Sequence, residues 1–119
     1  MDAAQRHLPL KPDVFQILLA LEAGERHGYA ILKEVERSTG GEIRLAPSPF
    51  YRRLKRLEDD GLVSEADDRP APELDDERRR YYELTALGML VLGAEARRLV
   101  ELTASDRILR LARAAAPKG

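Results

Sequence analysis

The order of the helix-forming and strand-forming segments is what most constrains the fold of this chain. Helices are predicted over residues 12–24, 29–41 and 48–61, because apolar residues recur three and four positions apart and each segment ends at glycine. Pro12 suits a helix start because it has no N–H to leave unsatisfied, and Ser48 is a good N-cap before a proline at the first helical position. Each short helix therefore has one face to bury.

Two strands and a long helix follow these segments. Residues 62–66 and 79–84 predict an antiparallel hairpin, and the acidic, proline-containing stretch between them forms its long tip. Residues 42–45 alternate between charged and apolar side chains, which predicts a short strand or an extended link. Thr85 is the predicted cap of the last helix, which continues to about Ala114.

The whole pattern predicts a winged helix-turn-helix. Three compact helices followed by a hairpin are typical of that fold, and its third helix is available for a DNA major groove. The predicted fold is thus mainly α with a small β-hairpin: a winged helix-turn-helix over residues 1–84, plus a long C-terminal dimerisation helix over residues 85–119. A kink or a second N-cap is expected in this last helix at Ser105 and Asp106.

The composition excludes several functional classes. The chain has 119 residues, enough for one domain with its own core, and it has no cysteine, so disulfides and thiolate chemistry are ruled out. Two histidines and the lack of a glycine-rich phosphate loop predict no metal site, no cofactor and no enzyme. Because no apolar run reaches membrane-spanning length, a cytoplasmic protein without membrane contact is expected.

The charges are unevenly distributed, although the net charge is only −1. Residues 43–57 contain five cations and no acid, and Arg78, Arg79 and Arg80 form a second basic cluster. A nearly neutral chain can still present one basic face to phosphates. The same residues can equally form ordinary solvated helix faces, so charge by itself does not decide between the two interpretations.

Four segments of the sequence resemble the PadR family of transcriptional regulators, in its short form with a single C-terminal helix. They read LLAL leading to HGYAI, PFYRRLKRLEDDGLV, DDERRRYY and LTALG, at residues 18–31, 49–63, 75–82 and 84–88. Pro49 and Phe50 depart from the small polar residue and leucine that the family usually shows, but they keep a helix start and an apolar contact. The resemblance covers most of the chain, from about Leu10 to about Gly88.

The resemblance implies a homodimer that binds a palindromic operator in double-stranded DNA, usually to repress. In this family the third helix enters the major groove and the wing touches the flanking backbone. In many members a small molecule, often aromatic or cationic, releases or alters DNA binding. The function expected from the resemblance is therefore a sequence-specific repressor with a possible small-molecule effector.

The predicted DNA contacts lie on the third helix and at the base of the wing. Arginine can pair with guanine through two hydrogen bonds, and serine and tyrosine hydroxyls can reach phosphates. The candidates are Ser48, Tyr51, Arg52, Arg53, Lys55 and Arg56 on the helix, and Arg78, Arg79 and Arg80 at the wing. Arg53 and Arg56 can instead pair with nearby acids, as the wing arginines can with the acids that precede them.

The residues that open the second helix are predicted to be structural. His27 is expected to cap or pack rather than to act as a ligand. Gly28 is expected to let the chain turn tightly, and Tyr29 is expected to be buried close to the third helix.

The last helix carries more apolar surface than its own domain can cover. Its apolar residues form two lines displaced around the helix, so one line can pack on the winged domain while the other needs a partner. The second line holds Leu92, Ala96 and Leu99. The predicted dimerisation residues are Leu87, Val91, Leu92, Ala96, Leu99 and Leu102. Which line forms the dimer is left open.

A winged helix used for protein interaction, with the acidic loop as its docking surface, is the alternative function. The low net charge and the acidic wing tip favour this alternative. The basic, acid-free stretch of residues 43–57 favours DNA.

Overall fold

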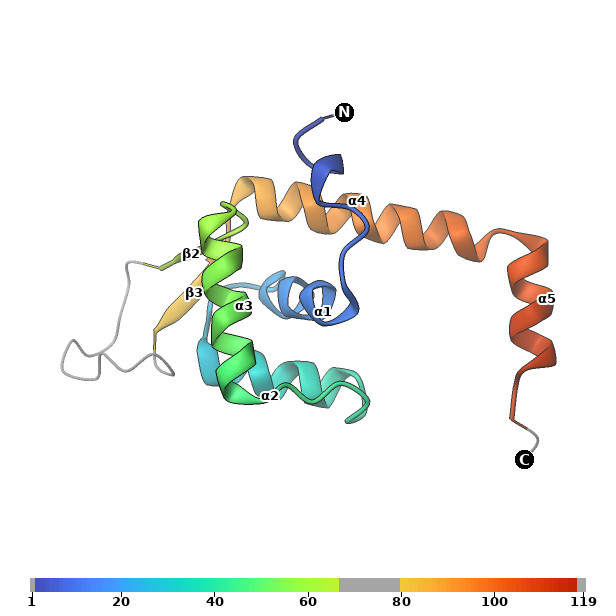
Figure 1. The fold of residues 1–119 in the computed structure, drawn as a ribbon, viewed down its shortest axis with the longest axis horizontal. Coiled ribbons are helices and arrows are strands. Elements are labelled where there is room, and N and C mark those ends of the chain that lie inside the picture. Colours follow the sequence, from blue (N-terminus) through green and yellow to red (C-terminus); the bar gives the residue numbers. More distant parts are fainter. Residues whose placement is uncertain (1, 67–79, 118–119) are drawn as a thin grey trace.

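The computed structural model describes residues 2–66 and 80–117, and it places helices around a small sheet (Figure 1). The elements are η1 (Gln5–His7), α1 (Pro12–Leu21), β1 (Arg26–His27), α2 (Gly28–Ser38), α3 (Pro47–Asp59), β2 (Val63–Glu65), β3 (Tyr81–Leu84), α4 (Ala86–Thr103) and α5 (Asp106–Ala114). Within the described residues, no helix combines the length and apolar character needed to cross a membrane.

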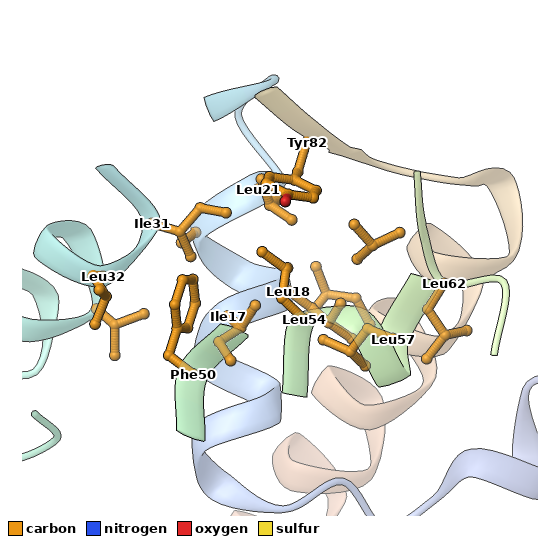
Figure 2. Close-up of a cluster of buried hydrophobic side chains, with 14 of the residues drawn as sticks. Ile17, Leu18, Leu21, Ile31, Leu32, Phe50, Leu54, Leu57, Leu62 and Tyr82 are labelled. Atoms are coloured by element: carbon orange, nitrogen blue, oxygen red, sulfur yellow. The ribbon is translucent and has the colours of Figure 1, made fainter. Parts of the chain in front are cut away.

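Helix α1 lies at the centre of the core and packs against α2, α4 and β3. Its Ile17, Leu18 and Leu21 are buried, as the spacing of three and four residues predicts. Figure 2 shows these side chains meeting those of α2, α3 and the sheet. The facing residues are Ile31, Leu32, Phe50, Leu54, Leu57, Leu62 and Tyr82.

Helix α3 begins earlier than the sequence analysis predicted. Its N-cap is Ala46, which makes no side-chain cap, and Pro47 rather than Pro49 occupies the first helical position. The N–H of Phe50 donates to the carbonyl of Ala46 at 3.0 Å, so regular helical bonding already starts there. Ser48 therefore lies within the first turn instead of capping the helix.

The predicted hairpin is present, and a third strand joins it. Strands β2 and β3 pair antiparallel, with Val63 opposite Leu84, and β1 pairs with the other edge of β3. The two residues of β1 were not predicted as a strand, because a two-residue strand is too short to show an alternating pattern. Residues 42–45 contain no strand: residues 42 and 43 form a bend, and residues 44 and 45 have no regular secondary structure.

The C-terminal segment forms two helices rather than one. Thr85 caps α4 by accepting the N–H of Gly88 at 2.9 Å, and its hydroxyl donates to the carbonyl of Gly61 at 2.6 Å. Helix α4 ends at Thr103, and Ser105 caps α5 by accepting the N–H of Ile108 at 3.4 Å. The second N-cap expected at Ser105 is thus confirmed, and α5 turns away from α4 at the end of the molecule opposite α3 (Figure 1).

Candidate nucleic-acid interface

Helix α3 has one buried face and one exposed face. Phe50, Leu54 and Leu57 are at most 5% exposed and anchor the helix in the core. The opposite side carries the predicted DNA-contacting residues of α3 other than Arg53, over a shallow concave surface. That surface is lined by Pro47, Ser48, Tyr51, Arg52, Lys55, Arg56 and Asp59. Because these residues share one side of a rigid helix, they can all approach the same partner.

Tyr51 is half-buried and joins α3 to the start of α2. A Cβ placed on Gly28 would lie 2.8 Å from Cε1 and 2.9 Å from the hydroxyl oxygen of Tyr51. The Tyr51 ring also meets the ring of Phe50 edge-on, with centroids 4.8 Å apart. Gly28 is not among the glycines with positive φ. It is needed for the close approach of Tyr51, and the predicted turn role is wrong.

Arg53 points away from the exposed face of α3. Its Nε lies 2.5 Å from Oδ2 of Asp13 on α1, and both side chains are partly shielded from solvent. The alternative that Arg53 pairs with a nearby acid therefore describes this structure. Its side chain ties α3 to α1.

Two more cations of α3 pair with acids one turn later on the same helix. Lys55 Nζ lies 3.3 Å from Asp59, and Arg56 Nε lies 3.4 Å from Asp60. All four side chains are solvent-exposed, so such pairs contribute little stability and are readily exchanged. Arg52 is exposed as well, and within residues 2–66 and 80–117 it has no ion-pair partner.

The first turn of α3 offers few hydrogen-bond donors. Pro47 and Pro49 have no backbone N–H, and the N–H of Phe50 already bonds to Ala46. The N–H and the hydroxyl of Ser48 are therefore the donors that this turn presents beside Arg52.

The base of the wing carries Arg80, whose Nε lies 3.6 Å from Oε1 of Glu65. Burial, and then the charge of Glu65, raise the pKa of the Glu58 carboxyl at the end of α3 above its ordinary value. The other two predicted wing contacts, Arg78 and Arg79, lie outside the described residues, as does the predicted acidic tip.

The start of α2 differs from the prediction at Tyr29. His27 caps the helix, as expected, because its Nδ1 accepts the N–H of Ala30 at 3.1 Å. Tyr29 was expected in the core but is 47% exposed. The buried residues of α2 are Gly28, Ile31, Leu32 and Val35, which share one side of the helix. Tyr29 lies off that side and therefore faces outward.

Two of the six predicted dimerisation residues belong to the core of their own domain. Val91 is 0% and Leu92 is 4% exposed, so neither retains surface for a partner. Leu87 packs partly against the same core, Leu99 is half-buried, and Ala96 is exposed. Leu102 is 42% exposed.

The apolar pattern of α4 does not reveal which side of the helix is buried, because one of the buried residues is a glutamate, Glu95. Glu95 is 2% exposed and pairs with Arg98 through two hydrogen bonds of 2.7 and 2.9 Å. The Arg98 guanidinium, helped by the Leu10 N–H, holds the pKa of the Glu95 carboxyl below its ordinary value despite burial. Met89, Leu90 and Val100 consequently face outward.

The described residues hold no candidate metal site at this surface. Among residues 2–66 and 80–117 there is no group of three or more histidine, aspartate or glutamate side chains arranged to hold a metal ion. The hydroxyl of Tyr51 is buried, so what α3 presents is the hydroxyl of Ser48 and a row of cationic groups, which suits hydrogen bonding and ion pairing with a polyanion.

Comparison with known proteins supports this interpretation. The sequence pattern of the transcriptional regulator PadR-like family matches residues 17–94. None of the curated proteins compared with the chain matches it significantly.

Several solved structures share the fold. A complex structure of hsRosR-S4 is 25% identical, with 92% of this chain and 90% of that chain covered and a TM-score of 0.68. RosR of H. salinarum is 27% identical, with coverage of 88% and 89% and a TM-score of 0.63. PadR of Bacillus subtilis, in complex with operator DNA, is 27% identical, with coverage of 72% and 47% and a TM-score of 0.60.

These matches confirm the predicted winged helix fold and the prediction of a regulator rather than an enzyme. The family pattern covers well over half of the chain, including all of α2, α3 and the described strands β2 and β3. The chain belongs to the PadR-like family of transcriptional regulators.

Proposed function

We propose that this protein is a sequence-specific repressor that binds a palindromic operator as a homodimer and is released by a small-molecule effector. The observation that carries the proposal is the two-sided character of α3, with a core-anchored apolar face and an opposite face of hydroxyl and cationic groups. The operator-DNA complex of Bacillus subtilis PadR, a relative by family, supports the same use of the fold.

In the proposed complex the exposed face of α3 enters the major groove. Arg52 carries no competing ion pair among the described residues, so its guanidinium is available for a guanine edge. The N–H and hydroxyl of Ser48 suit a phosphate at the groove margin. Lys55 can exchange its exposed aspartate for a phosphate at little cost, because an exposed ion pair is worth at most about 1 kcal/mol.

Homodimerisation is proposed through the outward surface of the C-terminal helices. Leu90 is 64% and Val100 is 66% exposed on α4, and α5 has no buried residue. Leu90 and Val100 lie with Met89 on one side of α4, and these three residues form the apolar surface of that helix that a second copy can cover. A two-fold axis between the copies would place the two α3 helices about one DNA turn, roughly 34 Å, apart and so match a palindrome.

Effector release is proposed from the family, and the concave surface between η1 and α4 is a place where a ligand could act. That surface combines apolar side chains, including Leu8 and Met89, with Arg97 and Arg98, whose guanidinium groups are paired with Glu101 and Glu95. A ligand bound there would contact α4, the helix that is proposed to set the spacing of the two DNA-reading helices.

The test is selection of a preferred duplex from a random pool, followed by a salt series on the Arg52→Ala, Lys55→Ala double variant. Operator affinity should fall, and the slope of log affinity against log salt should flatten by roughly one unit for each phosphate that is no longer neutralised. Arg6→Ala, which removes an exposed charge on η1, is the control and should bind like the parent. A double variant that binds as tightly as the parent at every salt concentration would exclude α3 as the reading helix.

A different result would favour the alternative function, in which the winged helix binds another protein. If the parent protein shows no salt-dependent binding to any duplex, the winged helix serves protein interaction instead, and the DNA proposal fails.

A further inference from the structure

Tyr29 and Lys33 form an exposed pair on α2 that the α3 interface does not use. The ammonium nitrogen of Lys33 lies 5.3 Å from the centroid of the Tyr29 ring, and Tyr29 is 47% exposed. An ammonium group at this distance from an aromatic face is attracted by the ring quadrupole. The ring therefore holds the lysine head close to the first turn of the helix.

The lysine of this pair keeps its charge available. Within the described residues Lys33 has no ion-pair partner, since the adjacent Glu34 is bound by Arg37 at 2.6 Å. That hydrogen bond also lowers the pKa of Glu34, so Glu34 stays charged and paired with Arg37. Lys33 is thus an exposed cation beside an exposed tyrosine, and ammonium and hydroxyl groups both bind phosphate oxygens.

The pair lies next to the exposed face of α3. Tyr29 directly follows Gly28, and Gly28 is covered by the ring of Tyr51, so the first turn of α2 is fixed against the N-terminal half of α3. Figure 1 shows the start of α2 alongside α3. In a helix-turn-helix bound to DNA, the helix before the reading helix crosses the phosphate backbone.

The charges of α3 leave room for a further contact to the DNA backbone. Arg53 is directed toward α1, and Lys55 and Arg56 are paired with aspartates on their own helix. Arg52 therefore stands as the cation of α3 without such a pair in the described part of the chain. Non-specific affinity for DNA comes almost entirely from neutralised phosphates, so an unpaired cation on α2 adds to the attraction that Arg52 and the exchangeable Lys55 provide.

We propose that Tyr29 and Lys33 form a second phosphate-binding site, which grips the DNA backbone beside the groove that α3 enters. This inference rests on the proposed function. Lys33 supplies the charge, the Tyr29 hydroxyl donates a hydrogen bond to a phosphate oxygen, and the ring positions the lysine. Because phosphate contacts carry no base information, the site raises affinity for all duplexes alike and leaves sequence preference to α3.

The experiment measures binding of the full-length protein to the selected operator and to a random-sequence duplex by fluorescence anisotropy at several salt concentrations. Each neutralised phosphate contributes about 0.9 units of salt slope, which corresponds to about eightfold in affinity at about 0.1 M salt. In a symmetric dimer the substitution acts on both protomers, so Lys33→Ala should flatten the slope by about two units and weaken both duplexes by about 60-fold.

A second variant separates the hydroxyl from the charge. Tyr29→Phe keeps the ring under Lys33 and removes only a hydroxyl, so it should weaken both duplexes by about tenfold for each protomer with the salt slope unchanged. Both side chains are solvent-exposed, so far-ultraviolet circular dichroism and thermal unfolding should match the parent.

The matched control is Arg6→Ala, which removes one exposed charge from η1, on the α4 side of the molecule (Figure 1). It should leave affinity and slope at parental values. The inference is overturned if Lys33→Ala keeps the parental slope, or if its weaker binding is confined to the operator. If the parent binds neither duplex, the proposed function itself fails, a result distinct from an unchanged Lys33 variant.

Discussion

Two leucines that are two positions apart on α4 should respond in opposite ways to truncation. Leu92 is 4% exposed and belongs to the core of its own domain, whereas Leu90 is 64% exposed on the outward side. Leu92→Ala should therefore lower the free energy of unfolding of each protomer by about 2–5 kcal/mol. Leu90→Ala should leave the folding of the protomer nearly unchanged, as surface substitutions do.

For the stability of the dimer, the order of the two substitutions is expected to be reversed. Burying a whole leucine side chain stabilises by roughly 1.5–3 kcal/mol, so covering the 64% of Leu90 that is exposed contributes about 1–2 kcal/mol. A two-fold interface contains two copies, so Leu90→Ala should weaken the dimer by about 2–4 kcal/mol. That change corresponds to a dissociation constant raised about 30-fold to several hundred-fold.

The assay combines sedimentation velocity over a range of micromolar concentrations with urea unfolding at one fixed concentration. The concentration must be matched because the apparent stability of a dimer depends on it. We expect Leu90→Ala to be a folded protein shifted toward monomer, and Leu92→Ala to be a destabilised protein. A Leu90→Ala protein that dimerises like the parent, beside a Leu92→Ala protein that is stable but monomeric, would refute the assignment of these two faces.

Three further predictions test other parts of the structure. The hydrogen bonds to Arg98 lower the pKa of Glu95 from 4.5, so the charged form of Glu95 stabilises the folded protein above about pH 4.5. This stabilisation is lost as the pH falls through the lowered pKa. Glu95→Gln should therefore flatten the pH dependence of urea unfolding in that acidic range. Gly88→Ala should destabilise by at least about 1–3 kcal/mol in thermal unfolding, because a Cβ there would overlap the carbonyl of Leu62, and a parental melting temperature would contradict that packing. Arg80→Ala should weaken operator and random DNA by the same factor, since a wing contact to phosphate positions without specifying; a weakening seen with the operator alone would assign Arg80 to base recognition instead.

The sequence predicted those parts of the fold that depend on neighbouring residues. Proline and glycine set the limits of α1 and α3 to within two or three residues, and the caps at Thr85 and Ser105 were found from their residue types. The periodicity of three and four residues identified Phe50, Leu54 and their partners as core. These features are local because helix starts and binary patterns are encoded within a few residues.

The tertiary structure decided what the exposed residues can do. The pairing of Arg53 with Asp13 joins residues 40 positions apart, and the strand at Arg26 and His27 exists only because β3 lies beside it. Tyr29 is turned outward by the packing of its neighbours. Such contacts depend on how helices pack on one another, which no short stretch of sequence encodes. The sequence alone determined a winged helix with a basic third helix, but only the packing decided which cations and which face of α4 remain available to a partner.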